Sequence, residues 1–415
     1  MESTQQLLVK GKCKDIYYVN PETTFKECIR TKTSTKYSQA LTQLAGGTSV
    51  FLVPPNYGLQ DVVVQLQLPA VPAGAGANIA LAPGWGYALI KSISYRIAGS
   101  TQFFVTGQQM LQYALKACPN ATARNDLFTL GGAYVTGAGF EASTNFAYVW
   151  LGLPFAKPTS EAKPSPLPTD LINSQVQITI ELNPLSAILS NNSGGALNAA
   201  FNSLASGQFT VQQVLMESRD DSLAAHESLA TLEYPYPVTF LQQSQQVSCA
   251  NTASVQTIVA SGFRSGTVKS IEMWLTKGSD TSGNTKNPLK WYAPLDVTVT
   301  YAGDIYAQFS AGSSQLWNLI NSKQTPQVAG TTLGYAGGAY TTTSESYQWV
   351  SAPFAQTYDP ADSSEYMLNE GIQVQNGIVN IAFRTPSAAA DWVLNLSYVY
   401  AATAVFSQST CELVF

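Results

Sequence analysis

Apolar and polar residues alternate along most of this chain, and clusters of glycine and proline separate the alternating runs. A period of two is typical of a β-strand that buries one face. In the first half, strands are predicted at residues 49–53, 61–68, 89–97, 102–105, 175–182 and 209–216. In the second half, they are predicted at residues 255–260, 268–275, 295–301, 306–309, 373–383 and 392–399. Helical spacing is found chiefly at residues 108–117 and 313–321, so the pattern predicts an all-β protein with few helices.

The order of these features repeats between the two halves. In each half a tryptophan precedes an alternating run, a glycine turn, aromatic residues, a second glycine and a helix-like stretch, and a Pro-Phe-Ala triplet follows later. The matched landmarks are Trp85 and Trp291, Gly99 and Gly303, Gly107 and Gly312, and the triplets at 154–156 and 353–355. A repeat of about 200 residues is far longer than the ~20–50 residues of solenoids and propellers, so it predicts two tandem domains of one fold.

The domain organisation follows from this repeat. We expect an N-terminal arm at residues 1–36, a first jelly roll at 37–218, a charged connector at 219–232 and a second jelly roll at 233–415. About eight short strands per half favour two packed antiparallel sheets of jelly-roll type. The predicted fold is therefore two tandem eight-stranded antiparallel jelly-roll β-sandwiches with short helices and long loops. Long loops are predicted at residues 69–83, 118–143, 157–170, 183–207, 276–288 and 321–344.

The N-terminal arm is basic. Its seven lysines and arginines are a third of the 21 in the chain. They are Lys10, Lys12, Lys14, Lys26, Arg30, Lys32 and Lys36. Such a segment suits an anionic partner, such as a membrane surface, an acidic protein or a genome. A solvated terminal extension is the alternative, because Asp15, Glu22 and Glu27 dilute the charge.

The charge content separates this chain from most soluble proteins. Only 11% of its 415 residues are charged, against about 25% on average. A surface of this kind repels its neighbours weakly and suits a protein that packs against copies of itself. The net charge of −5 argues against a chain that mainly binds nucleic acid, because that role needs a basic surface.

The termini and the cysteines indicate a soluble chain made inside a cell. No apolar run approaches the roughly 18 residues of a membrane span, and the first nine residues lack the apolar core of a signal peptide. The five cysteines have no CxxC spacing, so free thiols are favoured over a disulfide framework.

The residue types in the sequence give little support for an enzyme. The single histidine, His226, lies in the polar connector, and the sequence contains no phosphate-binding loop or HExxH motif. A glycosidase would need two carboxylates about 5–9 Å apart, which the sequence cannot place. The acidic loop residues that could form such a carboxylate pair are Glu141, Glu161, Asp280, Asp359, Asp362 and Glu365. We therefore predict no catalytic, metal or cofactor site.

Residues 90–100 (IKSISYRIAGS) read as a strand and a glycine turn, and the helix-like residues 110–113 (MLQY) follow them. This order looks like that of the first barrel in one family of viral capsid proteins. With the tandem jelly rolls and the polar arm, the chain resembles the double jelly-roll major capsid proteins of icosahedral double-stranded DNA viruses. That lineage includes adenovirus hexons, tailless membrane-containing phages, virophages and large algal viruses.

The resemblance implies a structural protein and not an enzyme. We expect a homotrimeric, pseudo-hexameric capsomer that contacts neighbouring capsomers and minor capsid proteins in the virion, after synthesis and assembly in the host cell. The basic arm would lie on the inner face, near minor proteins or an internal membrane, with no specific nucleic acid bound. Two alternatives stay open: a minor capsid or spike protein of such a virus, and a carbohydrate-binding or carbohydrate-cleaving β-sandwich protein.

Overall fold

The computed structural model describes most of both predicted jelly rolls. The described residues are 28–41, 47–53, 59–68, 73–74, 77–97, 101–117, 121–133, 135–136, 146–151, 176–191, 207–218, 234–236, 241–252, 254–261, 266–281, 288–309, 332–336, 339–343, 349–354, 372–374, 378–388, 391–401, 403–407 and 410–414.

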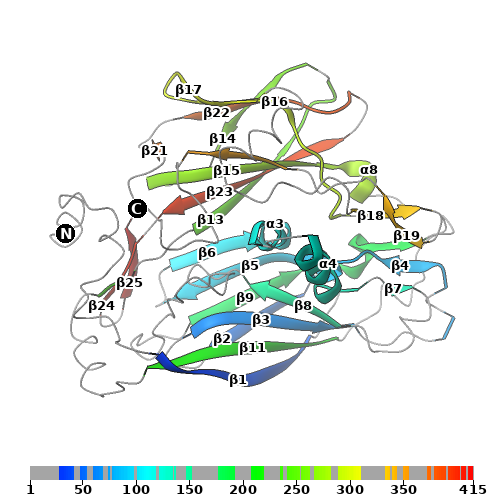
Figure 1. Ribbon diagram of the computed structural model, residues 1–415, viewed down its shortest axis with the longest axis vertical. Coiled ribbons are helices and arrows are strands. Elements are labelled where there is room, and N and C mark those ends of the chain that lie inside the picture. Colours follow the sequence, from blue (N-terminus) through cyan, green and yellow to red (C-terminus); the bar gives the residue numbers. More distant parts are fainter. Residues whose placement is uncertain are drawn as a thin grey trace.

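Eight strands of the first half form two antiparallel four-stranded sheets (Figure 1). The first sheet has the order β1-β11-β3-β8 and the second has the order β2-β9-β5-β6. The strands are β1 (Cys28–Leu41), β2 (Thr48–Val53), β3 (Leu59–Gln67), β5 (Ile90–Ile97), β6 (Thr101–Thr106), β8 (Phe146–Leu151), β9 (Val176–Leu182) and β11 (Gly207–Ser218).

Eight strands of the second half repeat this topology. Their sheets have the orders β13-β23-β15-β20 and β14-β22-β16-β17. The strands are β13 (Leu241–Ser248), β14 (Gln256–Ala260), β15 (Gly266–Lys277), β16 (Leu295–Tyr301), β17 (Asp304–Gln308), β20 (Val350–Pro353), β22 (Val379–Arg384) and β23 (Trp392–Ala401). If the strands of each half are counted from one to eight, both halves read 1-8-3-6 and 2-7-4-5. Two tandem jelly rolls are therefore confirmed.

The predicted strands form where the alternation placed them, apart from residues 373–383, whereas β1, β8, β13 and β20 were not predicted. In β9 the residues Val176, Ile178, Ile180 and Leu182 are buried, and the residues between them are half-buried. β22 shows the same alternation, with its buried residues facing the core of the second barrel. The hydrophobic face drives this packing, because apolar side chains at every second position share one side of a strand.

The single strand predicted at residues 373–383 is two strands in the structure. Residues 373–383 divide into β21 (Ile372–Val374), which pairs with β15, and β22, which pairs with β14 and β16. The two strands belong to different sheets of the second barrel. Asn376 and Gly377 interrupt the alternation between the two strands, and the Asn-Gly dipeptide is a turn signal that the prediction passed over.

Several predicted loops contain ordered elements. The stretch 118–143 holds the helix α4 (Ala121–Leu130) and the strand β7 (Val135–Thr136), and 321–344 holds a hairpin of β18 (Thr332–Ala336) and β19 (Ala339–Thr343). The further elements in predicted loops are β4 (Ile79–Leu81), η1 (Leu185–Ala187), β10 (Leu189–Asn191) and α8 (Gly278–Thr281). These elements are short and irregular in hydropathy, and local patterning is least informative for such segments. The predicted helix at 313–321 lies outside the described residues.

The predicted arm at residues 1–36 needs a correction, because β1 begins at Cys28. Residues 28–36 pair with β11, with Lys32 opposite Leu215. β1 is an edge strand, and edge strands commonly carry lysine, which discourages pairing with other chains. The basic composition that suggested a separate arm is thus compatible with a strand. Lys10, Lys12, Lys14 and Lys26, and the connector 219–232 with His226, lie outside the described residues.

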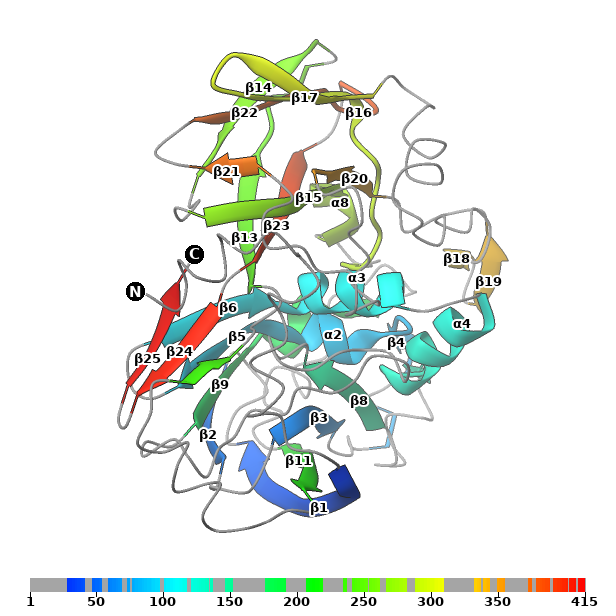
Figure 2. The ribbon, with the colours of Figure 1, turned by 60° about the vertical axis from the view of Figure 1, so that its left-hand side comes forward.

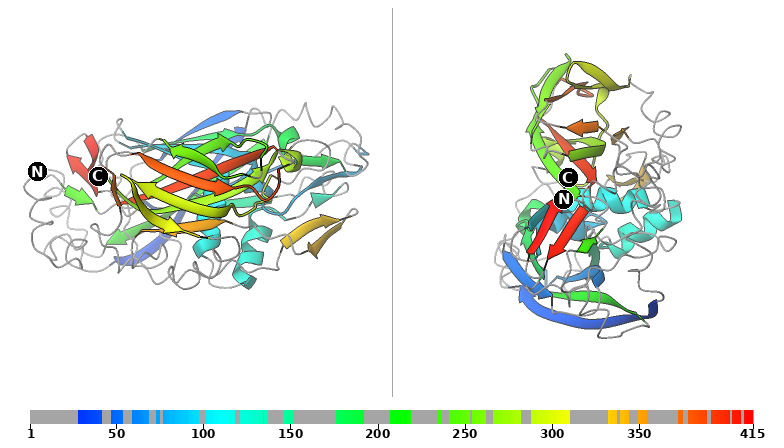
Figure 3. Two further views of the ribbon diagram at one scale, coloured as in Figure 1. Left: turned by 90° about the horizontal axis from the view of Figure 1, so that it is seen from above. Right: turned by 90° about the vertical axis from the view of Figure 1, so that its left-hand side faces the viewer.

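The four main sheets follow one another along the long axis of the molecule (Figures 1 and 2). The sheet that contains β1 lies at one end, and the sheet that contains β17 lies at the other. A small sheet of β12 (Tyr234–Tyr236), β24 (Thr403–Ser407) and β25 (Thr410–Val414) lies beside β6, so the last strands of the chain contact the first barrel (Figures 2 and 3).

No helix among the described residues is long and apolar enough to cross a membrane.

Candidate functional site

The junction between the two barrels is centred on the helix α3 (Gly107–Ala117), which follows β6 without a loop. A capping box starts this helix. The backbone N–H of Gln109 donates to Thr106 Oγ1 at 3.3 Å, and the backbone N–H of Thr106 donates to Gln109 Oε1 at 3.0 Å. Two N–H groups that a helix start leaves without partners are satisfied in this way. The strand can therefore turn directly into a helix that lies against the second barrel.

Three glutamines of α3 bind the second barrel through hydrogen bonds. Gln109 Nε2 donates to Ser397 Oγ of β23 at 2.9 Å, and Gln112 Nε2 donates to Glu272 Oε2 of β15 at 3.4 Å. Gln108 accepts a bond of 3.2 Å from the Trp274 indole N–H and donates one of 3.3 Å to the carbonyl oxygen of Pro288. Because these bonds have fixed geometry, they set the position of one barrel against the other.

Glu272 is a buried carboxylate at the centre of this junction. Only 1% of its surface is exposed. Its Oε1 accepts bonds from the Ser351 and Ser270 hydroxyls at 2.8 and 3.2 Å, and its Oε2 accepts the bond from Gln112. A buried polar group is costly unless it is hydrogen-bonded, so this set of donors is what the position requires.

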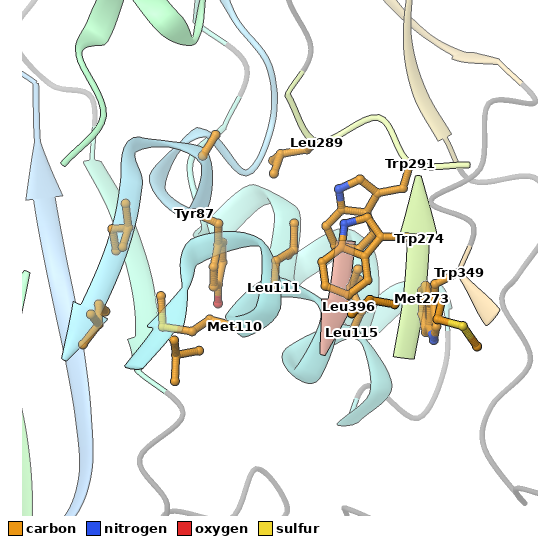
Figure 4. Packing of buried hydrophobic residues seen from close by; sticks show 14 of the residues in the cluster. Tyr87, Met110, Leu111, Leu115, Met273, Trp274, Leu289, Trp291, Trp349 and Leu396 are labelled. Atoms are coloured by element: carbon orange, nitrogen blue, oxygen red, sulfur yellow. The ribbon is translucent and has the colours of Figure 1, made fainter. Parts of the chain in front are cut away.

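A hydrophobic cluster surrounds the polar contacts (Figure 4). Met110, Leu111 and Leu115 of α3 belong to the same buried cluster as Trp274 and Trp291 of the second barrel. The rings of Trp274 and Trp291 lie 5.3 Å apart, and Trp349 meets Trp291 edge to face. Apolar burial of this kind supplies most of the association energy between packed units. The two barrels thus share one continuous core.

Close backbone contacts hold α3 in place. A Cβ on Gly107 would lie 2.1 Å from the carbonyl oxygen of Tyr87 and 2.4 Å from that of Ile90. Tyr87 belongs to the short helix α2 (Trp85–Leu89), whose Gly86 N–H donates to the carbonyl oxygen of Gly131 at 2.9 Å. Glycine at these positions allows backbone to pass against backbone.

Of the six acidic residues that the sequence offered for catalysis, only Asp280 lies in the described part of the chain. Asp280 accepts a hydrogen bond of 2.8 Å from the Tyr292 hydroxyl, and burial raises the pKa of Tyr292 to about 12. The described residues contain no group of three histidine, cysteine or acidic side chains that could hold a metal ion. Cys249 is a free thiol, and burial raises its pKa. The remaining candidate acids lie outside the described residues: Glu141, Glu161, Asp359, Asp362 and Glu365.

The residues of the junction were not singled out from the sequence. Gln108, Gln109 and Gln112 lie in the segment predicted to be helical, but nothing marked them as contacts between domains. One signal was available: Thr106 and Gln109 have the spacing of a capping box just before an apolar run. Glu272 and Ser397 carried no signal, because polar residues on alternating strands are normally solvent-facing.

Comparison with known proteins identifies the fold as the double jelly roll of viral major capsid proteins. The sequence matches no protein-family model and no curated protein. The structure is similar to that of the PBCV-1 virus capsid, with a TM-score of 0.61 and 12% identity over 94% of this chain and 100% of that one. It is also similar to the Faustovirus major capsid protein, with a TM-score of 0.55 and 12% identity over 95% of this chain and 94% of that one. The Sputnik virophage structure gives a TM-score of 0.55 and 11% identity over 96% and 92%.

Replacing Gln109 with alanine is expected to lower the free energy of unfolding by about 2 kcal/mol. Loss of the bond that Gln109 Oε1 accepts from the Thr106 backbone N–H contributes roughly 1 kcal/mol, and loss of the buried bond to Ser397 contributes a similar amount. Urea unfolding followed by fluorescence measures the change. Gln373→Ala, which removes an exposed glutamine from β21, is the control and should change the value by less than about 0.5 kcal/mol. Equal effects of the two substitutions would contradict the role of Gln109.

Proposed function

We propose that this chain is the major capsid protein of an icosahedral double-stranded DNA virus. The observation that carries the proposal is the pair of jelly rolls with identical strand order, joined by a shared core into one unit. A protein whose work is to tile a shell needs repeated, firmly connected building blocks, and it needs no catalytic centre. Solved structures that share this fold include the PBCV-1 virus capsid, the Faustovirus major capsid protein and the Sputnik virophage.

The working unit is a homotrimer with a pseudo-hexagonal outline. Two barrels per chain and three chains give six similar barrels around one axis, which is a closed cyclic arrangement. The low content of charged residues, 11% of the chain, supports extensive contact between copies. Trimers would then contact neighbouring capsomers and minor capsid proteins in the virion.

The basic segment would face the inside of the shell. Lysines at 10, 12, 14 and 26 precede β1, and Arg30, Lys32 and Lys36 lie in β1 itself. A cluster of this kind attracts anionic lipid headgroups or acidic proteins at short range. We assign it to an internal membrane or to minor capsid proteins. The first jelly roll then runs from β1 to residue 218, with the connector at 219–232 and the second jelly roll at 233–415.

Size-exclusion chromatography with light scattering tests the oligomeric state. The purified full chain should elute as one species of about three times its mass of 44.4 kDa, because a cyclic capsomer needs three copies. A monomer at micromolar concentration would contradict the proposal and favour a glycan-binding sandwich. Electron microscopy of particles that contain the chain then separates a major from a minor capsid protein, since only the major protein covers the whole shell.

A further inference from the structure

The helix α3 has two faces of different character, and both are buried. Met110, Leu111 and Leu115 belong to the hydrophobic cluster of the junction (Figure 4). Gln109 and Gln112 are three positions apart and therefore lie on one side of the helix, where they are 0% and 1% exposed. A helix at the surface of a soluble protein turns its polar side chains to water. The burial of two glutamines therefore indicates a specific role for them.

The sheet surface beneath these glutamines is polar as well. Ser397 of β23 and Ser351 of β20 lie on either side of Glu272 of β15 in the register, so the three residues form one row across the sheet. Each of them is at most 1% exposed. Gln109 donates to Ser397, and Gln112 donates to Glu272. We call these five side chains the polar joint, because their hydrogen bonds link the first barrel to the second.

The polar joint adds orientation rather than net stability to the junction. Burial of polar groups is costly, and apolar side chains of similar size often give the same stability or more. Hydrophobic contacts have no preferred direction, so a helix held by them alone can rotate or slide over a sheet. Hydrogen bonds allow only a narrow range of distances and angles. The contribution of the polar joint beside the hydrophobic cluster is thus a single orientation of α3 on the sheet.

We propose that the polar joint fixes the angle between the two barrels and thereby allows three chains to close into one capsomer. The inference rests on the proposed homotrimer, and it names Gln109, Gln112 and Glu272 as the residues that position its barrels. In a closed ring, the rotations from each barrel to the next must add up to one full turn. Every second rotation lies within a chain, at the polar joint. A joint that is free to rotate would be ordered during assembly, and the entropy lost in that step would weaken the trimer.

A second buried polar group on the same sheet provides a matched comparison. Asn395, two residues from Ser397 on β23, is 3% exposed. It donates to Thr276 Oγ1 at 3.1 Å and accepts a bond of 2.9 Å from Gln246 Nε2. These three residues all belong to the second barrel, on β23, β15 and β13. The group is similar to the polar joint in burial and chemistry, but its bonds do not reach α3.

The test replaces the carboxylate together with its donors in the full chain, as Gln112→Met, Glu272→Met, Ser270→Ala and Ser351→Ala. Ser270 is included because its hydroxyl also donates to Glu272. Since the polar partners are removed together, the midpoint of urea unfolding should stay the same or rise. Sedimentation equilibrium should nevertheless show a trimer at least about tenfold weaker than that of the unmodified chain.

Spin labels on the two barrels report the angle directly. Thr48 of β2 and Ser248 of β13 are exposed, and both can be replaced by an unnatural amino acid that carries the label, so the five cysteines stay unlabelled. Labelled chains are mixed with an excess of unlabelled ones, and double electron–electron resonance measures the distance between the labels. The unmodified chain should give a narrow distribution of distances. The quadruple variant should give a broader one.

Two controls separate orientation from charge and from burial. Relative to Glu272→Met, the conservative variant Glu272→Gln should restore the trimer and the narrow distribution. Its oxygen can accept the serine bonds, and its amide N–H can donate to Gln112 once that side chain turns over. Asn395→Leu together with Thr276→Val removes a buried polar bond within the second barrel, and it should leave the assembly and the distances unchanged.

The outcomes distinguish this inference from the proposed function. A quadruple variant with unchanged distances, or with broader distances and an equally tight trimer, overturns the inference and leaves the capsomer standing. A monomeric unmodified chain overturns the capsomer and with it the role in ring closure. If the quadruple variant does not fold by circular dichroism, Gln112→Leu replaces it, because Glu272 then keeps its two serine donors. The same weaker trimer and broader distances are expected, and their absence overturns the inference.

Discussion

Replacing Trp274 with alanine is expected to destabilise the protein by about 3–5 kcal/mol, the usual range for removing a buried tryptophan. The indole is 1% exposed, packs 5.3 Å from the ring of Trp291 and donates to Gln108 Oε1. Its loss leaves a cavity between the barrels and removes a donor from the half-buried Gln108 side chain. Guanidinium unfolding measured by circular dichroism reports the change.

Two further variants make the Trp274 result specific. Trp274→Phe keeps a ring in the cavity and loses the hydrogen bond, so its cost should be smaller, about 1–2 kcal/mol. Val255→Ala removes an exposed side chain of the second barrel and should change stability by less than about 0.5 kcal/mol. If Trp274→Ala costs no more than Val255→Ala, the junction does not contribute to stability as the packing indicates.

Replacing Gly107 with alanine is expected to cost at least about 3 kcal/mol and to reduce the yield of folded protein sharply. The added Cβ would lie 2.1 and 2.4 Å from the carbonyl oxygens of Tyr87 and Ile90, and backbone cannot move aside as a flexible side chain can. The start of α3 would have to shift, and with it the glutamines that bind the second barrel. Thermal unfolding and soluble yield measure the effect.

Gly74 is the matched control for Gly107. A Cβ on Gly74 would meet nothing within 4 Å, but its φ of +81° is a left-handed conformation. Gly74→Ala should therefore cost only the backbone strain, about 1–2 kcal/mol. Similar losses for the two alanines would mean that the close approach at Gly107 is relieved by local adjustment.

Much of the fold could be predicted from hydropathy alone. The predicted strands apart from residues 373–383 were placed within about two residues of their observed ends, because one buried face per strand imposes a period of two. The landmarks around Trp85 and Trp291 also predicted two domains of one fold. The break between β21 and β22 was missed although Asn376 and Gly377 mark a turn there, and the helix α4 was missed inside a predicted loop.

The functional surfaces were much harder to predict from the sequence than the strands. Glu272 and Ser397 have the letters and spacing of solvent-facing strand residues, and only the docking of α3 makes them buried. Which side of a strand meets solvent depends on what covers the sheet, and the pattern along one strand carries no information about that cover.

From its sequence alone, this chain is defined as an all-β protein with a duplicated jelly-roll plan, few charged residues and no recognisable catalytic motif. These properties are local or additive, and each can be read from neighbouring residues or from composition. The tertiary structure decides that α3 joins the barrels and that a polar sheet face of the second barrel is buried beneath it. Those features depend on contacts between residues 160 to 288 positions apart, and such contacts arise only when the whole chain is folded.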